Sequence, residues 1–326
     1  MNESFKPPIA FHHVLEDPGL VRRLVEENGP YSPVQRYFQN AAEYRALSGS
    51  DAQQMIVAPN FRGDFAYDQP LVPGVEPILY HEGFRAAAAE LFDAKVVVPF
   101  SVYANITWQL PFDQGGGHTD VPEFRGFDRT RYPTTLLSLM GHSRLFEDYR
   151  ISIATAVAWY YEGSDGGFMY WPDGPDRPPR VHEGRIFNTA LEADNERMFH
   201  RVRPVGRRRD GMLTRLTLES RLVHEGGDDW EIVDCGHTLA ELRWPALRIS
   251  LSWKARVYAD EQARRVHLER RDELGLDEVV ARFRADLDRR GVAHAPPQDP
   301  VREPAWLDLL SATYMRAPSV FEPVAA

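Results

Sequence analysis

The sequence predicts a mainly β fold with flanking helices, a closed or sandwiched barrel, and three observations support this. Short runs rich in β-branched and aromatic residues recur between residues 95 and 260, separated by Gly, Pro and Asp. Helical patterns stand before and after that region. The chain has 326 residues, of which 43% are hydrophobic and 11% aromatic, and this is enough to build a large core.

Three segments follow from these patterns. Residues 1–94 are expected to be mainly helical with loops and to pack on the barrel, because GLVRRLVEE and the alanine-rich HEGFRAAAAELFDA both fit helices. Residues 95–260 form the predicted barrel. Residues 261–326 return to a helical pattern and are expected to form a C-terminal extension. We expect the three segments to make one integrated unit.

The predicted barrel strands begin with KVVVPFSVYANITWQLPF at Lys95. The later runs are ISIATAVAWYYEG, GGFMYWPDG, GRIFNTALEA, MFHRVRPVG, LTRLTLESRLV and LRISLSWKARVY.

Charge and cysteine content exclude several classes of protein. The net charge of −10 argues against nucleic-acid binding, which depends on clustered Lys and Arg. The single cysteine, Cys235, excludes an intramolecular disulfide framework and a cysteine-based zinc site. No run approaches the roughly 18 apolar residues of a membrane span, and the first residues do not resemble a signal peptide. We therefore expect a cytoplasmic protein that does not bind membranes.

The segment GGGHTDVPEF, at residues 115–124, carries the first candidate metal ligands. His118 and Asp120 are one residue apart, so on an extended strand both side chains project from the same face. An imidazole and a carboxylate placed side by side can bind one metal ion. Glycines at 115–117 permit a close approach of backbone and metal.

His200, in the strand-like run MFHRVRPVG, is the candidate third ligand. Two histidines and one carboxylate leave further coordination positions open, which is typical of iron(II) oxygenases. The same three residues are also compatible with a zinc hydrolase. The residues alone therefore predict a metal site without fixing the metal.

Four motifs in order resemble the 2-oxoglutarate- and iron(II)-dependent dioxygenases. The family has His-x-Asp, then a Gly-Gly-aromatic strand, then a His before Val-x-Pro, then Arg-x-Ser. This chain has His118-Thr-Asp120, Gly166-Gly167-Phe168, His200-Arg-Val202-Arg-Pro204 and Arg248-Ile-Ser250. The resemblance covers roughly residues 95–258.

The resemblance implies a double-stranded β-helix, also called a jelly roll or cupin-like barrel, as the catalytic core. It implies Fe(II) held by His118, Asp120 and His200, and 2-oxoglutarate as cosubstrate. Arg248 would hold the far carboxylate of 2-oxoglutarate, since a guanidinium fits a carboxylate with two parallel bonds. Ser250 alternates with it on the same strand, and the early-strand residues Tyr103 and Asn105 are expected to line the same cavity.

One departure from the family pattern concerns the position of that arginine. Arg248 lies 48 residues after His200, whereas the family arginine follows the second histidine more closely. An insertion has to lie between the two. Nearer to His200 lie Arg203, Arg207, Arg208 and Arg209. Arg248 is preferred because it stands in a cleanly alternating strand, but the choice between it and the nearer arginines stays open.

The resemblance implies oxidation of a C–H bond, usually hydroxylation, in a small molecule such as an amino acid or a specialised metabolite. Three arginines in the loop 121–133 could hold an anionic group of that substrate: Arg125, Arg129 and Arg131. An ordinary charged loop is the alternative. A cupin-like dioxygenase or isomerase that does not use 2-oxoglutarate, and a non-catalytic binding protein on the same barrel, are the competing hypotheses. The oligomeric state is not predicted.

Overall fold

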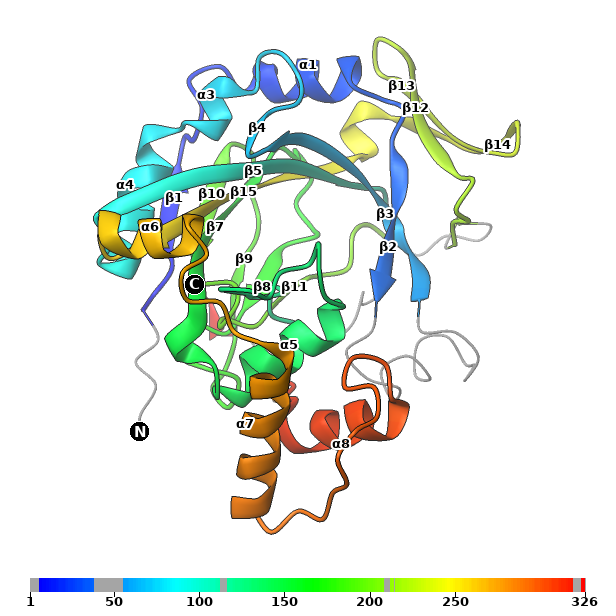
Figure 1. The fold of residues 1–326 in the computed structure, drawn as a ribbon. Helices are drawn as coiled ribbons and strands as arrows, with labels where there is room; N and C mark the ends of the chain where they lie inside the picture. Colours follow the sequence, from blue (N-terminus) through cyan, green and yellow to red (C-terminus); the bar gives the residue numbers. More distant parts are fainter. Residues whose placement is uncertain are drawn as a thin grey trace.

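A computed structural model describes residues 6–37, 55–111, 116–207, 212–213, 215–318 and 324–325. A large, strongly twisted sheet and a smaller sheet form its centre, and helices flank them (Figure 1). Trp159 and Leu191 of the large sheet pack against Phe168 and Tyr170 of the small one. The two sheets therefore face each other across a buried interior.

The large sheet runs in the order β1-β10-β7-β15-β5-β3-β2, with β4 paired to β3 and β6 paired to β7. Its paired strands are antiparallel. The strands are β1 (Ile9–His12), β2 (Ser32–Tyr37), β3 (Met55–Tyr67), β4 (Gln69–Pro70), β5 (Val96–Thr107), β6 (Glu123–Phe124), β7 (Arg150–Trp159), β10 (Thr189–Ala193) and β15 (Arg248–Tyr258).

The outer face of the large sheet is covered by helices α1 (Gly19–Glu27), α3 (Glu76–Leu79) and α4 (Glu82–Phe92) (Figure 1). Alternate residues of β15, such as Leu251 and Trp253, join Phe84 of α4 in this core. The indole nitrogen of Trp253 donates to the backbone oxygen of Leu79, 2.8 Å away. The alternation sends every second residue of the central strands outward and leaves the others facing the small sheet.

The small sheet runs in the order β11-β8-β9-β16. Its strands are β8 (Phe168–Tyr170), β9 (Arg180–His182), β11 (His200–Val202) and β16 (Val324–Ala325). A backbone bridge between His118 and His200 adds the segment around His118 beside β11. This bridge brings two of the predicted metal ligands onto neighbouring strands.

The remaining elements lie around the sheets. Strands β12 (Arg221–Gly226), β13 (Asp229–Asp234) and β14 (His237–Arg243) form a separate antiparallel sheet. Helix α5 (Thr134–Ser143) packs with α7 (Leu276–Arg289) and α8 (Pro304–Tyr314) in a second core below the small sheet, and α6 (Glu261–Leu268) follows β15 (Figure 1). Two single 3₁₀ turns occupy Glu147–Tyr149 and Trp244–Ala246.

The prediction of mainly helical structure before residue 95 was wrong for much of that segment. Strands β1 to β4 lie there, and β2 and β3 extend the large sheet beyond β5. In β3 the buried Phe61 and Phe65 alternate with Arg62 and Asp64, which is a strand pattern. The helices at Gly19–Glu27 and Glu82–Phe92 were predicted correctly.

Candidate metal centre

Backbone pairing places His118 directly opposite His200. The His118 amide donates to the His200 carbonyl at 3.0 Å, and the His200 amide donates to the His118 carbonyl at 2.9 Å. Residues that exchange both hydrogen bonds in this way carry side chains on the same side of the pair. The two imidazole rings accordingly lie with their centroids 4.5 Å apart.

Asp120 completes the cluster. Its amide donates to the Asn195 carbonyl at 2.7 Å, which attaches Asp120 to the loop before β11. Oδ1 of Asp120 lies 3.7 Å from Nε2 of His200. Each of the three side chains offers one ligand atom, and these atoms all lie within 4.8 Å of one another. The arrangement predicted from His-x-Asp and a distant histidine is therefore present, and its spacing fits a single metal ion.

The hydrogen bonding of His200 suits a metal ligand. Nδ1 of His200 lies 3.0 Å from the Met198 carbonyl, so this nitrogen carries the proton and Nε2 presents a lone pair toward Asp120. Burial lowers the pKa of His200 although the Asp120 carboxylate opposes this. The neutral imidazole is thus favoured near neutral pH, which is the form that binds a metal.

Gly117 explains part of the glycine run before His118. Its φ of +91° is unfavourable for residues with a side chain, and a Cβ there would lie 3.0 Å from Pro318 and 3.3 Å from the Trp171 ring. Gly115, by contrast, lies outside the described residues. The glycine at 117 therefore lets the backbone turn closely under the metal ligands.

Lys254 of β15 is a neighbour of the site that the sequence analysis did not single out. Its ammonium donates to Oδ2 of Asp120 at 2.6 Å and to Oγ1 of Thr155 at 3.3 Å. Burial alone would raise the pKa of Asp120, but the charge of Lys254 and its hydrogen bond to the carboxylate hold that pKa below its usual range. Asp120 is therefore ionised at neutral pH, with Oδ2 bound to Lys254 and Oδ1 directed toward His200.

Arg248 is buried at the start of β15, on the face opposite to the outer core. Only 2% of the surface of this residue is exposed to solvent, and its Nε donates a hydrogen bond to the Gly166 carbonyl at 2.7 Å. Nη2 is buried and has no hydrogen-bond partner among the residues that the structure describes. Burial lowers the pKa of Arg248 to about 10, which still leaves the group charged at neutral pH. A buried cation with an unsatisfied donor fits an anionic ligand.

Gly166 provides the space for Arg248. It adopts a φ of +65°, and an added Cβ would lie 2.9 Å from Cδ of Arg248 and 2.9 Å from Val205. A larger residue at this position would push the guanidinium away from its place. The first glycine of the Gly166-Gly167-Phe168 motif therefore leaves the room that the Arg248 side chain occupies.

The other predicted cosubstrate residues lie on the same face. Ser250 pairs with Asn105 across β15 and β5, and Nδ2 of Asn105 donates to Oγ of Ser252 at 3.5 Å. Tyr103 lies on the same face of β5, and the Arg62 guanidinium stands over its ring at 3.5 Å. Tyr103, Asn105 and Ser250 therefore share one face of β5 and β15 with Arg248.

The arginines nearer to His200 are placed differently. Arg203 forms an exposed ion pair with Glu183, and Arg207 is exposed. Arg208 and Arg209 lie outside the described residues. The long interval before Arg248 contains β12, β13 and β14, which form their own sheet and leave β15 between β5 and β7. The insertion predicted between His200 and Arg248 is therefore present.

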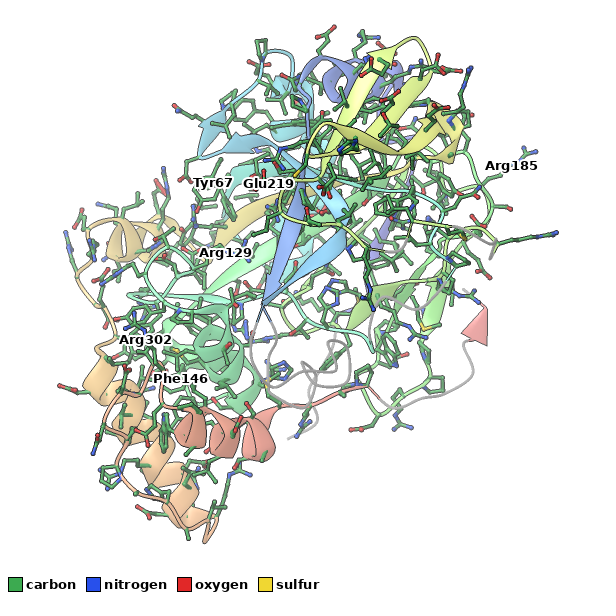
Figure 2. All side chains as sticks on the ribbon, turned by 90° about the vertical axis from the view of Figure 1, so that its right-hand side faces the viewer. Tyr67, Arg129, Phe146, Arg185, Glu219 and Arg302 are labelled. Atoms are coloured by element: carbon green, nitrogen blue, oxygen red, sulfur yellow. The ribbon has the colours of Figure 1, made fainter. Side chains whose placement is uncertain are left out.

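The three loop arginines differ from one another. Arg125 donates to Oδ2 of Asp272 at 2.9 Å and to the Asp148 carbonyl at 2.7 Å. Arg131 pairs with Glu273 at 3.4 Å. Both contacts join the loop to the segment before α7. Arg129 is exposed, on the same side of the molecule as Tyr67 (Figure 2), and its charge acts on Lys254.

Comparison with known proteins gives structural likeness without sequence similarity. No protein-family model matches the chain, and no curated protein matches it. An oxidoreductase of the 2OG-Fe(II) oxygenase family from Burkholderia pseudomallei is similar over 77% of this chain and 85% of its own, with 12% identity and a TM-score of 0.42. A Pseudomonas putida prolyl-4-hydroxylase is similar over 77% and 93%, with 12% identity and a TM-score of 0.39.

A third similar structure is HygX from Streptomyces hygroscopicus with nickel, 2-oxoglutarate and hygromycin B bound. It matches 78% of this chain and 84% of its own, with 9% identity and a TM-score of 0.38. Among the described residues, none of the helices has the length and apolar character to cross a bilayer.

Proposed function

We propose that this protein is a non-haem iron(II) oxygenase that uses O2 and 2-oxoglutarate to oxidise a small molecule, by hydroxylation, giving succinate and CO2. The cluster of His118, Asp120 and His200 carries the proposal, because two histidines and one carboxylate on one side of a metal leave positions for a cosubstrate and oxygen. When bound, Fe(II) would supply the activation of oxygen for C–H oxidation.

The residues around the cluster support a role for each side chain. His118 and His200 would bind the metal through neutral imidazoles, and Asp120 through Oδ1, since Lys254 holds Oδ2. Arg248 would receive the distal carboxylate of 2-oxoglutarate through its unpartnered nitrogen, with Ser250, Asn105 and Tyr103 lining the approach. The buried setting strengthens the contact between the arginine and a carboxylate.

We further propose that the two sheets are the halves of a double-stranded β-helix, with residues 95–260 as the catalytic core. Along the chain, strands alternate between the sheets: β5 in the large one, His118 beside the small one, β7 large, β8 and β9 small, β10 large, β11 small and β15 large. Such alternation winds the chain around a shared interior. The segments 1–94 and 261–326 would complete one catalytic unit.

The competing hypothesis of a cupin-like enzyme without 2-oxoglutarate is less well supported. The observation in favour of that hypothesis is the long interval between His200 and Arg248. Strands β12 to β14 lie in this interval and form a separate sheet, so the interval is an insertion. A non-catalytic barrel would need neither the three ligands nor the buried arginine.

Anaerobic titration tests the metal and the cosubstrate together. Iron(II) is added to the metal-free protein, then 2-oxoglutarate, and the visible metal-to-ligand charge-transfer band is recorded. The band should appear only with both components. Protein that binds iron but gives no band with 2-oxoglutarate would favour the cupin-like alternative, and protein that binds no iron(II) would overturn the proposal.

Ligand variants sharpen this test. His118→Ala, Asp120→Ala and His200→Ala should each lose iron and the succinate formed from 2-oxoglutarate while the fold persists. His237→Ala, an exposed histidine of β14, is the matched control and should behave as the parent protein. Full activity in any of the three variants would remove that residue from the metal site.

A further inference from the structure

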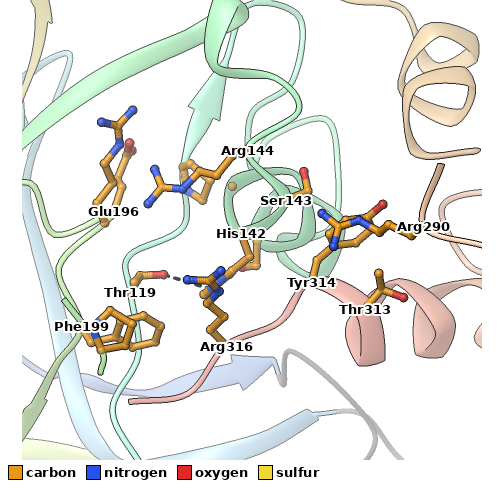
Figure 3. A pocket seen from close by; sticks show the side chains of 15 residues that line it. Thr119, His142, Ser143, Arg144, Glu196, Phe199, Arg290, Thr313, Tyr314 and Arg316 are labelled. Carbon is orange, nitrogen blue, oxygen red and sulfur yellow. Dashed lines mark hydrogen bonds between the residues drawn. The ribbon is translucent and has the colours of Figure 1, made fainter. Parts of the chain in front are cut away.

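A pocket lined by arginines lies behind the segment that carries the candidate metal ligands His118 and Asp120. It has a cavity volume of about 140 Å³, and four arginines line it: Arg144, Arg197, Arg290 and Arg316. They come from the end of α5, the loop before β11, the end of α7 and the segment after α8. Figure 3 shows Arg144 and Arg316 beside Thr119 and His142. Cations from four parts of the chain therefore surround one hollow.

The pocket is separate from the metal cluster, although it shares a segment with it. Thr119 lies between His118 and Asp120, and its side chain lines the pocket while theirs join the metal cluster. Phe199 likewise lines the pocket, whereas its neighbour His200 belongs to the cluster. Oγ1 of Thr119 is 3.4 Å from Nε2 of His142. The two sites thus lie on opposite sides of the same backbone.

Positive charge in the pocket is only partly balanced. Among the described residues that line it, the one acid is Glu196, and its carboxylate is bonded to Arg150 at 2.8 Å. Arg144 pairs with Glu147 at 3.7 Å, Arg290 pairs with Asp286 at 2.6 Å, and Arg197 pairs with Glu147 and Asp194. Arg316 has no carboxylate within ion-pair distance in the described part of the chain, so it is the pocket cation whose charge is left over. Burial and the charges of Arg144, Arg316 and Arg150 lower the pKa of His142 to about 4. His142 is neutral at neutral pH and adds no further positive charge.

We propose that this pocket, lined by Arg144, Arg197, Arg316, His142 and Thr119, binds a tetrahedral oxyanion of the phosphate class, either inorganic phosphate or the phosphoryl group of a small metabolite. A single guanidinium can donate hydrogen bonds to both oxygens of a planar carboxylate. Guanidiniums from different elements, together with a hydroxyl, suit an anion that presents several oxygens in different directions. The cavity has room for such a group.

Binding of the anion should also restrain the metal-ligand segment. Thr119 and His142 join that segment to α5, and Arg144 is the residue that ends α5. An anion held by Arg144 and Arg316 would therefore hold α5 and the segment around Thr119 in place beside each other. The inference does not depend on which metal the neighbouring cluster takes or on whether it binds 2-oxoglutarate.

The direct test is calorimetric titration of metal-free full-length protein with inorganic phosphate, at ionic strength held constant with sodium chloride. Sulfate and acetate are titrated in the same way. Phosphate and sulfate should bind, and acetate should bind at least about tenfold more weakly. No heat of binding and no rise in Tm with phosphate would overturn the proposal, and equal binding of acetate would overturn the assigned class.

Variants locate the binding. Arg316→Gln and Arg144→Gln should each weaken phosphate binding at least about tenfold, through loss of a charge-assisted bond. Arg185→Gln makes the same change of charge at an exposed residue that lies across the molecule from Phe146, the residue two after Arg144 (Figure 2). It should bind phosphate like the parent. Equal weakening in all three variants would show general charge attraction and not a site.

Hydrogen exchange gives a second readout in the same metal-free protein. Phosphate should slow amide exchange across residues 116–122 in the parent protein and in Arg185→Gln. The protection should be absent in Arg144→Gln at the same phosphate concentration. Phosphate binding without protection of 116–122 would overturn the coupling to the metal-ligand segment. A protein that binds phosphate as expected but fails the iron titration would leave this site standing and remove the oxygenase proposal.

Discussion

The two faces of β15 have opposite chemistry although their residues alternate one by one. The outward residues are apolar and belong to the core under the helices: Ile249, Leu251, Trp253, Ala255 and Val257. The inward residues are polar or charged: Arg248, Ser250, Ser252, Lys254 and Arg256. Because side chains of a strand alternate with a period of two, one strand can build a core and a binding site together.

This difference assigns separate consequences to neighbouring substitutions. Outward side chains contribute burial of apolar area, so their loss should lower the free energy of unfolding. Inward cations are already held by specific partners: Lys254 by Asp120, and Arg256 by Glu123 and Asp68. Arg248 has an unpartnered nitrogen among the described residues. Changing Arg248 should therefore affect ligand binding more than stability, whereas removing Lys254 or Arg256 would leave a buried carboxylate without its cation.

The largest expected effect is on the outer face. Trp253→Ala should lower the free energy of unfolding by about 3–5 kcal/mol, because it removes a buried indole and its bond to Leu79. Urea unfolding followed by fluorescence measures this. Ser252→Ala, one residue away on the inner face, is the control and should cost less than about 1 kcal/mol. Equal losses in the two variants would contradict the division between the faces.

The next effect concerns cosubstrate binding on the inner face. Arg248→Lys keeps the charge but loses the two-pronged contact, so 2-oxoglutarate affinity should fall by about 1.5–3 kcal/mol, with iron affinity little changed. The charge-transfer titration gives both affinities. Arg203→Lys changes an exposed arginine that pairs with Glu183 and should have no effect. If Arg203→Lys abolished 2-oxoglutarate binding and Arg248→Lys did not, the assignment of Arg248 would be wrong.

Alternation also explains what the sequence could and could not predict. His118, Asp120 and His200 were found from residue type and strand spacing, and the structure brings them together. Lys254 was missed, although it stands six residues after Arg248 and therefore on the same face. Its importance depends on contact with Asp120, 134 residues away in the sequence, which no local pattern reveals.

The N-terminal strands differ from Lys254, because a local pattern for β3 is present in the sequence. Phe61 and Phe65 alternate with polar residues, so a local signal for β3 was present. The helical patterns on both sides of that segment are stronger and favour helix across it. The pairing of β3 with β5, by contrast, joins residues about 40 positions apart, and such pairing follows from the sheet as a whole.

Glu192 is an exception on the outer side of the large sheet. It lies on the same face of β10 as Ala190, which belongs to the outer core, and its two carboxylate oxygens have no hydrogen-bond partner among the described residues. Burial raises the pKa of Glu192 to about 9. The folded protein thus holds a proton that the unfolded chain releases above its ordinary value of 4.5.

The contribution of Glu192 to the free energy of unfolding should therefore fall as the pH rises. The contribution of Glu192 is fully present below about pH 4.5 and is lost progressively up to about pH 9. Glu192→Gln cannot ionise, so at pH 6 it should be more stable than the parent by about 2 kcal/mol, and at pH 4.5 the two should agree within about 0.5 kcal/mol. Urea unfolding at the two pH values measures this. A constant difference between the proteins at both pH values would rule out ionisation of Glu192 as the cause.

The smallest expected effects lie in the loop 121–133, and they test how far the inner face extends. Arg125 and Arg131 are engaged with Asp272 and Glu273, so each Ala variant should cost at most about 1 kcal/mol of stability and leave turnover unchanged. Arg129 is exposed and acts on Lys254, so we expect it to lie nearest to a bound substrate.

Arg129→Ala should leave stability within about 0.5 kcal/mol of the parent. If the loop shields the site from water, this variant should form more succinate from 2-oxoglutarate without added substrate than Arg125→Ala or Arg131→Ala. Succinate formation and urea unfolding of the three purified variants give the comparison. Equal succinate formation in all three and in the parent would limit the functional inner face to the strands themselves, and the loop arginines would serve only to attach the loop to the segment before α7.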